Sequence, residues 1–176
     1  MADLPQMTFG HIGLNVIEMD PMIEFYTTVL GFTVTDRGKS SRGSDLAFLS
    51  RDPDEHHQIA LAEGRPPDNV STVNQISFRV ERFDQVRAMY ERLKAANALG
   101  ITPIDHGMAL SVYFPDPEGN RLEVYWTTPW YIQQPHAKPL DMEQSDDEIL
   151  AACRAKCEAD PTFRTMDDWK AAFARS

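Results

Sequence analysis

Two histidines, a glutamine and a glutamate stand in strand-like segments of the sequence, where polar side chains are unusual. Glu123 lies between Leu122 and Val124, and a carboxylate in an interior strand is costly unless it is paired or bound to a cation. Imidazole and carboxylate groups together suit a divalent ion of the iron, manganese, nickel or zinc group. The sequence therefore predicts a metal site if these side chains converge. The residues concerned are His11, His57, Gln75 and Glu123.

An internal repeat indicates how such residues could be brought together. The segment HIGLNVIEMDPMIEFY, His11–Tyr26, aligns without a gap on QISFRVERFDQVRAMY, Gln75–Tyr90. In each copy, apolar and polar residues first alternate as in a half-buried strand, and apolar residues then recur at helical spacing. Asp20 and Asp84 stand at matching places, where we expect each to cap the helix that follows.

Glycine-punctuated strand candidates follow each copy of this strand and helix. They read GFTVTDRG, SDLAFLSRD and HQIALAEG in the first half, and ITPIDHGM, ALSVYFPD and NRLEVYWT in the second. The predicted fold is α+β, with two tandem βαβββ modules that form a funnel-like mixed sheet. His11 and Gln75 are then equivalent on the first strands of the modules, and we expect His57 and Glu123 to be equivalent on the last strands.

The rest of the chain forms a predicted tail with two short helices. The first helix should start at Ser145, with Glu148 completing a capping box, and the second should follow Asp160 and Pro161. This amphipathic tail either packs on the domain edge or reaches a partner subunit, and we expect a homodimer. The predicted domain spans residues 1–130, with modules at about 8–64 and 73–130 and a linker at 65–69 (RPPDN). The predicted tail spans residues 131–176. Its first part, 131–144, is a Pro-rich segment that we call the wrap.

Composition narrows the possible partners. The chain has 27 acidic and 17 basic residues and a formal charge of -10, so its field would repel a phosphate backbone, and nucleic acid is not an expected partner. No stretch approaches the roughly 18 apolar residues of a membrane span, and the start lacks a secretory pattern, so we expect a cytoplasmic protein. Cys153 and Cys157 are predicted to be free thiols on one helical face.

The tandem modules, together with HIGLNV, FYTTVLGF and VYFPDPEGNRLEVYW, closely resemble the vicinal oxygen chelate superfamily. This superfamily includes glyoxalases, fosfomycin and bleomycin resistance proteins, and type I extradiol dioxygenases. HHQIALAEG and YFPDPEGNRLEVY are most similar to one-domain extradiol dioxygenases of the biphenyl-2,3-diol or catechol type. The resemblance implies ring cleavage of a catechol-type aromatic diol by O2, with Fe(II), or else Mn(II) or another divalent metal, as the cofactor.

The resemblance also implies roles for particular residues. Gln75 stands where this branch has its second histidine ligand, and its amide oxygen can still bind a metal. Three outcomes stay open: an unusual dioxygenase, a non-oxidative metal-dependent lyase or isomerase of glyoxalase type, or a metal-free small-molecule-binding module of resistance type. The implied metal ligands are His11 and Glu123, the implied acid/base is His57, and the implied pocket groups are Tyr113 and His106.

Two further expectations concern the surroundings of Glu123 and the remaining histidines. Aromatic residues near Glu123 should wall an apolar pocket for a ring. His56 is interpreted as a surface group because its neighbour His57 should face the other side of the strand, and His136 is interpreted as solvated. The aromatic residues are Phe114, Tyr125, Trp126, Trp130 and Tyr131.

Overall fold

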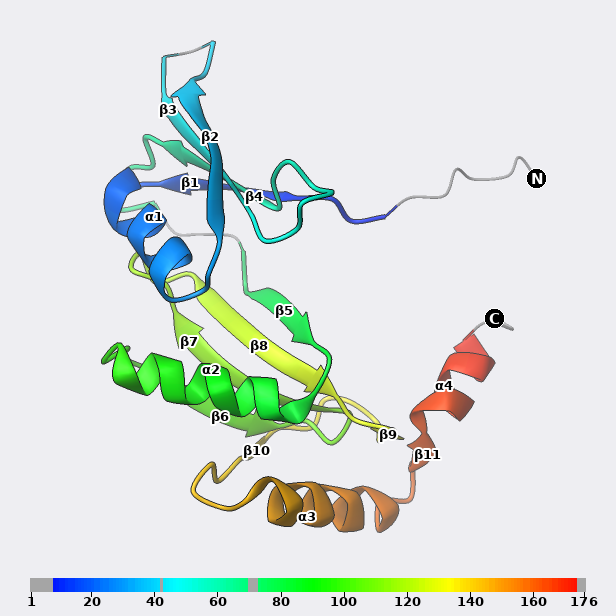
Figure 1. The fold of residues 1–176 in the computed structure, drawn as a ribbon. Helices are drawn as coiled ribbons and strands as arrows, with labels where there is room; N and C mark the ends of the chain where they lie inside the picture. Colours follow the sequence, from blue (N-terminus) through cyan, green and yellow to red (C-terminus); the bar gives the residue numbers. More distant parts are fainter. Residues whose placement is uncertain (1–7, 42, 70–72, 174–176) are drawn as a thin grey trace, which may run out of the picture. The chain divides into compact units, whose positions relative to one another are not determined.

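The computed structural model describes residues 8–41, 43–69 and 73–173 of the chain (Figure 1). The chain divides into two compact units, Met1–Ser71 and Thr72–Ser176, so the two copies of the repeat fall in different units and the tail belongs to the second. No helix in the described part of the chain is both long and apolar enough to cross a membrane.

The first unit is one βαβββ module. Its elements are β1 (Ile12–Val16), α1 (Met19–Thr28), β2 (Thr33–Lys39), β3 (Asp45–Ser50) and β4 (Ile59–Glu63). The strands form a sheet in the order β1-β4-β3-β2, in which β1 and β4 are parallel and the other neighbours are antiparallel. Helix α1 contacts this sheet and fully buries Met22 and Tyr26, which lie one turn apart on the same face.

The second unit contains the second module and the tail. The module comprises β5 (Ile76–Val80), α2 (Phe83–Ala95), β6 (Thr102–Asp105), β7 (Ala109–Pro115) and β8 (Arg121–Thr127). With β10 (Lys138–Pro139) of the tail, the strand order is β10-β6-β7-β8-β5, and β5 runs parallel to β8 as β1 does to β4. Strands β7 and β8 are joined through the predicted DPEGN turn, in which Gly119 takes a positive φ of 80°.

The predicted α+β fold with two tandem βαβββ modules is confirmed, and the repeat begins its strands and helices at matching residues. The predicted capping is wrong, because the residues at the N-cap positions are Glu18 and Arg82. Asp20 and Asp84 lie one residue inside the helix, in the first turn. A carboxylate in the first turn still favours the helix, because it faces the positive end of the helix dipole.

The sheet of the second unit has an apolar face and a polar face. Ser77 and Tyr113 both pair with Glu123, so the three side chains lie on the same face. The residues next to them along the strands point the other way, toward α2, where Val86 and Leu93 are fully buried. The apolar contact with α2 therefore fixes the orientation of the polar face.

The tail covers the edge of this second sheet. Its elements are β9 (Trp130–Tyr131), β10 (Lys138–Pro139), α3 (Asp146–Glu158), β11 (Arg164–Thr165) and α4 (Met166–Phe173). Strand β10 adds to β6, and β11 pairs with β9 (Figure 1). The capping box of Ser145 and Glu148 is confirmed, since the Ser145 side chain accepts a hydrogen bond from the Glu148 backbone N–H and Glu148 accepts one in return.

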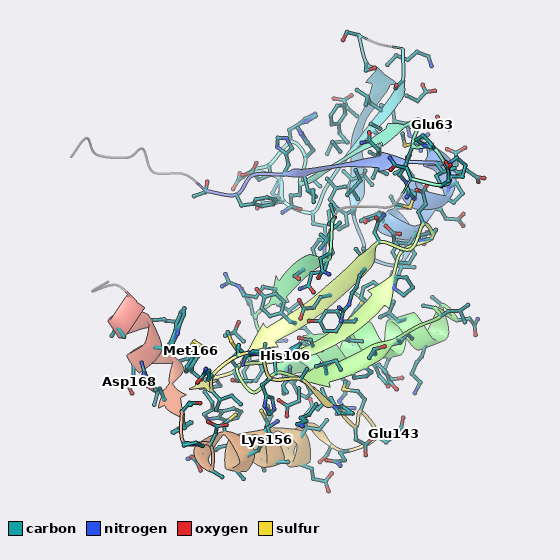
Figure 2. The ribbon with its side chains drawn as sticks, turned by 180° about the vertical axis from the view of Figure 1, so that it is seen from behind. Glu63, His106, Glu143, Lys156, Met166 and Asp168 are labelled. Atoms are coloured by element: carbon teal, nitrogen blue, oxygen red, sulfur yellow. The ribbon has the colours of Figure 1, made fainter. Side chains whose placement is uncertain are left out.

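Helix α3 is fixed to the second module by polar contacts as well as by its buried face. Lys156, labelled on α3 in Figure 2, forms an ion pair with Asp105 at the end of β6. Cys153 and Cys157 are free and buried on one face of α3, as predicted. Burial raises the pKa of the Cys153 thiol above its usual range, so the thiol stays protonated and is a poor nucleophile.

Candidate functional site

Three histidines of the first unit gather near the start of β1 and β4, where His57 contacts both His11 and His56. The ring centroids of His11 and His57 are 4.3 Å apart, and the Nδ1 atoms of His56 and His57 are 3.0 Å apart. Phe48 lies against His57, with ring centroids 5.0 Å apart. His11 and His57 meet because each stands just ahead of one of two parallel, neighbouring strands.

The relation between the two adjacent histidines differs from the prediction. His56 is exposed, as expected, but its ring contacts His57 and so does not face away from it. The second ring nitrogen of His56, Nε2, lies 3.1 Å from Asp36 Oδ2. Both histidines precede β4 and do not belong to it, so the alternating directions of strand side chains do not apply to them.

The environment of His57 favours the neutral form of its imidazole. Its pKa lies below the ordinary value of 6.5, chiefly because of burial, and the positive charges of His11 and His56 lower it further. The charge of Glu55 raises the pKa of His57, but this effect is the smallest of the four. At neutral pH His57 therefore carries a free lone pair, which is the state that a general base requires.

The strand registers give a different counterpart of Glu123 from the predicted one. The first residue of β1 pairs with Ile59, and the first residue of β5 pairs with Leu122. Because β1 and β5 are matching strands of the repeat, Ile59 corresponds to Leu122. The counterpart of Glu123 is therefore Ala60, and the predicted equivalence of His57 and Glu123 is wrong.

In the second unit, Glu123 is the centre of a hydrogen-bonded cluster on the polar face of the sheet. Its side chain is buried, with 6% of the residue exposed. Gln75 Nε2 donates to Glu123 Oε2 over 3.1 Å, and Ser77 Oγ donates to the same oxygen over 2.6 Å. Within the described residues, no lysine or arginine forms an ion pair with Glu123. Its charge is thus hydrogen-bonded but not neutralised.

Tyr113 stands opposite Glu123 on β7 and links it to His106. The Tyr113 hydroxyl lies 3.0 Å from His106 Nε2, and the guanidinium carbon of Arg121 lies 4.0 Å from the centroid of the Tyr113 ring. Burial raises the pKa of Tyr113 above its usual value, and the nearby Glu123 carboxylate, a second acceptor within reach of the phenol hydrogen, raises it further. Tyr113 is therefore a phenol, able to donate one hydrogen bond, throughout the physiological pH range.

The predicted site residues thus form one group in each unit. Among the described residues, no three His, Cys, Asp or Glu side chains gather as a ready metal-binding group within reach of one another. The predicted metal ligands include an amide and come from both units, so this finding does not test them. The group in the first unit is His11 and His57, and the group in the second is Gln75, His106, Tyr113 and Glu123.

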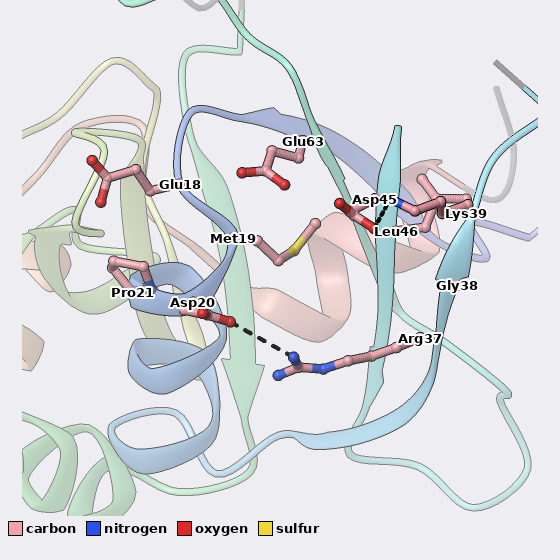
Figure 3. A pocket seen from close by; sticks show the side chains of 10 residues that line it. All are labelled: Glu18, Met19, Asp20, Pro21, Arg37, Gly38, Lys39, Asp45, Leu46 and Glu63. Carbon is pink, nitrogen blue, oxygen red and sulfur yellow. Dashed lines mark hydrogen bonds and ion pairs between the residues drawn. The ribbon is translucent and has the colours of Figure 1, made fainter. Parts of the chain in front are cut away.

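Neither of two clefts described in the chain contains a predicted metal ligand, acid/base or pocket group, although Trp126, a predicted wall residue, lines the second. The cleft in the first unit has a volume of about 570 Å³ and is lined by two ion pairs, Asp20 with Arg37 and Asp45 with Lys39 (Figure 3). The cleft in the second unit has a volume of about 680 Å³ and lies between Trp126 and the start of α4. The first is lined by Glu18, Met19, Asp20, Pro21, Arg37, Gly38, Lys39, Asp45, Leu46 and Glu63.

The predicted aromatic wall is wrong for two of its members. Phe114 is fully buried on the face of the sheet that α2 covers, because it pairs with Leu122 and not with Glu123. Trp126 is on that face too, and its ring contacts Phe83 of α2. Phe114 is one residue from Tyr113, and Trp126 is three residues from Glu123. Side chains an odd number of residues apart on a strand lie on opposite faces, so the sequence alone could have excluded both.

Other predicted wall residues lie elsewhere in the second unit. Tyr125 is half-buried and shares the polar face with Glu123, two residues away on β8. Trp130 and Tyr131 form β9, and the Tyr131 ring stacks on Trp169 of α4 with centroids 5.8 Å apart. Tyr131 therefore helps to hold the tail.

Several polar residues of the second cluster have no place in the sequence prediction. Ser77 and Arg121 lie two residues from Gln75 and Glu123, so strand alternation places them on the same face and could have identified them. Ser111 is on this face as well, and its hydroxyl is buried without a hydrogen-bond partner. No comparable periodic signal exists for residues of the wrap.

His136 in the wrap is half-buried, so the prediction that it is solvated is wrong. Its ring nitrogen Nε2 is buried without a hydrogen-bond partner, and its backbone carbonyl accepts a hydrogen bond from His106 Nδ1 over 2.7 Å. Burial lowers the pKa of His136, and the charge of Lys156 lowers it further. The proline-rich composition around His136 suggested exposure, but β10 pairing holds this segment against β6.

Comparison with known proteins places this architecture in a family. The model of the Glyoxalase/Bleomycin resistance protein/Dioxygenase superfamily matches residues 8–124. The chain is similar to biphenyl-2,3-diol 1,2-dioxygenase 2 of Rhodococcus globerulus, with 30% identity over 122 residues, or 66% of this chain and 60% of that protein. It is also similar to the manganese-dependent 2,3-dihydroxybiphenyl 1,2-dioxygenase of Geobacillus genomosp. 3, with 30% identity over 67% of this chain and 36% of that protein.

A solved structure supports the fold. The glyoxylase/bleomycin resistance protein/dioxygenase domain from Frankia sp. EAN1pec superimposes with a TM-score of 0.60 at 24% identity, covering 72% of this chain and all of that domain. The match to the Rhodococcus relative spans about 60% of the length of that protein. The residues that the family model matches, 8–124, belong to the two modules and end before the tail.

Proposed function

The chain belongs to the Glyoxalase/Bleomycin resistance protein/Dioxygenase superfamily, and on that premise we propose that it is a metal-dependent extradiol dioxygenase. The proposed reaction cleaves the ring of a catechol-type aromatic diol with O2. Two ring-cleaving relatives support this choice. The observation that carries the proposal is the buried Glu123 carboxylate, which has hydrogen-bond donors but, among the residues that the structure describes, no lysine or arginine as an ion-pair partner.

The chemistry of the Glu123 cluster fits a divalent cation. A buried carboxylate is costly unless a positive charge compensates for it, and Fe(II) and Mn(II) are bound by carboxylate, imidazole and amide oxygen. Gln75 donates through its amide nitrogen to Glu123, so its amide oxygen is the atom available to a metal. We therefore propose Gln75 and Glu123, together with His11, as the metal ligands.

When bound, the metal would supply positive charge that favours the ionised diol, and open coordination positions for the diol oxygens and O2. One relative is a manganese-dependent enzyme, which supports a divalent cation at this site. We propose Fe(II), with Mn(II) or another divalent metal as the alternative. Ser77, through its hydrogen bond of 2.6 Å, holds the Glu123 carboxylate in one orientation.

His57 is the proposed acid/base. Its lowered pKa leaves the imidazole neutral at pH 7, so the ring can accept a proton from a diol hydroxyl and return it later. Contact with His11 and Phe48 limits the orientations of the ring. A base whose position is fixed in this way loses little entropy when the substrate binds.

Tyr113 and His106 are the proposed pocket groups. The raised pKa of Tyr113 keeps its hydroxyl as a hydrogen-bond donor or acceptor toward a ligand oxygen. His106 fixes the direction of that hydroxyl through its Nε2 atom, over a distance of 3.0 Å. Aromatic surface for the ring of a diol would come from Tyr125, which shares the polar face.

Metal analysis of anaerobically purified protein is the direct test. We expect about one divalent metal ion per chain in the parent protein and in Glu81→Gln, which changes an exposed carboxylate of the same unit. Glu123→Gln should bind far less metal, because an amide is a much weaker ligand than a carboxylate. Metal content that is the same in Glu123→Gln would overturn the assignment of Glu123.

Activity is measured by adding 2,3-dihydroxybiphenyl or catechol under air and following the yellow ring-fission product. Colour that depends on metal and is lost in His57→Ala supports the proposal. Bound metal without colour for either diol would instead favour a non-oxidative lyase or isomerase. Protein that binds no added metal would contradict the enzyme and favour a small-molecule-binding module.

A further inference from the structure

Gln134, in the wrap, connects three backbone groups with one amide. Its Nε2 donates to the carbonyl oxygen of His106 over 2.9 Å and to that of Ile132 over 3.1 Å. Its Oε1 accepts from the backbone N–H of His136 over 3.1 Å. The side chain therefore joins the wrap to the turn between β6 and β7, where His106 lies (Figure 2).

The same region fixes which nitrogen of His106 carries hydrogen. Nδ1 of His106 lies 2.7 Å from the carbonyl oxygen of His136. A carbonyl oxygen only accepts hydrogen bonds, so Nδ1 must donate. In the neutral ring Nε2 then has the lone pair, and the hydroxyl of Tyr113, 3.0 Å away, donates its hydrogen to that atom.

We infer that Gln134 is a positioning residue that holds the His136 carbonyl against His106 and thereby sets the direction of the Tyr113 hydroxyl. Two acceptors are within reach of this hydroxyl, namely His106 Nε2 and the Glu123 carboxylate. Phenol has one hydrogen, so a hydrogen bond to His106 leaves Glu123 with fewer protein donors.

The consequence for catalysis rests on the proposed function. If the Tyr113 hydroxyl donates to His106, the Glu123 carboxylate keeps an oxygen lone pair that can bind a metal ion. The oxygen of Tyr113 then has a lone pair that can accept a hydrogen bond from a ligand. Gln134 touches neither metal nor substrate in this scheme. It acts through His106, so it positions a pocket group and is not itself catalytic.

The wrap has independent anchors, so replacing Gln134 should leave it in place. Lys138 and Pro139 pair with β6, and the backbone N–H of Leu140 donates to the carbonyl of Pro103 over 3.2 Å. Gln133, next in sequence, is exposed, and no hydrogen bond of its side chain is seen in the described structure. Gln133 therefore offers a matched control with the same side chain at the adjacent position.

The test reads the tautomer of His106 directly by NMR of 15N-histidine-labelled, metal-free protein. Long-range correlations between ring carbon-bound hydrogens and ring nitrogens distinguish hydrogen on Nδ1 from hydrogen on Nε2, and His106→Asn identifies the signal. In the parent protein we expect His106 to be one tautomer, with hydrogen on Nδ1. Gln134→Met should give an average of both tautomers, whereas Gln133→Met should match the parent.

Tyr113→Phe separates this role of the wrap from an effect of Tyr113. If the His136 carbonyl sets the tautomer, His106 keeps hydrogen on Nδ1 in Tyr113→Phe. Hydrogen on Nε2 in the parent protein would overturn the inference, and so would a single unchanged tautomer in Gln134→Met. Because the protein is metal-free in these spectra, loss of the proposed dioxygenase function would leave the result unaffected, and the two proposals can fail separately.

Discussion

Ser77 donates a hydrogen bond of 2.6 Å to Glu123, the shortest link between β5 and the carboxylate on β8. The two residues are paired across parallel strands, so the backbone register itself brings the hydroxyl to the carboxylate. The bond holds Oε2 in place, and Gln75 donates to the same atom. The orientation of the proposed metal ligand is thus determined by Ser77 on β5 and by Gln75, which directly precedes that strand.

Ser77→Ala should weaken metal binding without preventing folding. Loss of a hydrogen bond that orients a metal ligand typically lowers metal affinity by about 10–100-fold, and we expect a decrease in this range. Titration of metal-free protein with Mn(II) measures it. Ser111→Ala removes a hydroxyl from the same face that has no hydrogen-bond partner, so its affinity should equal that of the parent. An equal loss in both variants would contradict the role of Ser77.

The midpoint of the His57 titration should lie below 6.5 and should depend on neighbouring charges. His11→Ala should raise this midpoint, because a positive neighbour is removed, but burial should keep it below 6.5. Glu55→Gln should change it in the opposite direction, because the Glu55 carboxylate favours the protonated ring. NMR chemical shifts of the ring hydrogens against pH measure all three midpoints. Shifts of the same sign in both variants would contradict this account.

The same lowered pKa predicts how His57 affects stability. Below pH 6.5 the unfolded chain binds the His57 proton more readily than the folded chain does, so stability decreases as the pH falls from 6.5 to the folded midpoint. At higher pH the ring is neutral in both states and the effect disappears. Urea unfolding of the parent and of His57→Gln should therefore differ in pH dependence only below about 6.5, the unperturbed pKa of histidine.

Much of the fold could be predicted because the repeat needs only local information. The gapless match of the two copies fixed the first strands, which begin at Ile12 and Ile76, and the helices that follow them. Glu123 could be identified for a similar reason, since a carboxylate between two apolar strand residues requires a partner. Ser145 and Glu148 likewise form a signal within four residues of one another.

The predictions that were wrong concern residues whose positions depend on contacts with distant parts of the chain. The predicted equivalence of His57 and Glu123 depended on the register of β4 against β1. The loop before this last strand differs in length between the two modules, so the sequence does not reveal that register. The contact between His56 and His57 arises because they lie in this loop. Gln134 and His136 were missed because the wrap has neither strand nor helix periodicity, and its order comes from hydrogen bonds to the turn at His106.

Ile132 of the wrap packs against Gly107 in the turn between β6 and β7, which gives a prediction about stability. Its φ is 72°, and a Cβ at this position would lie 2.5 Å from Ile132 Cδ1 and 2.6 Å from Cγ1. Gly107→Ala should therefore combine the left-handed backbone cost of about 1–2 kcal/mol with an overpacking cost of about 1–3 kcal/mol. Urea unfolding measures the sum.

Gly119→Ala separates the two contributions. Gly119 also has a positive φ, 80°, but a Cβ there would meet nothing within 4 Å, so only the backbone cost should remain. In an Ile132→Val background, which lacks the Cδ1 atom, Gly107→Ala should cost less than in the parent, because one of the two clashes is gone. Equal costs of Gly107→Ala and Gly119→Ala would mean that Ile132 does not lie against the turn, and that the wrap does not pack where His106 is held.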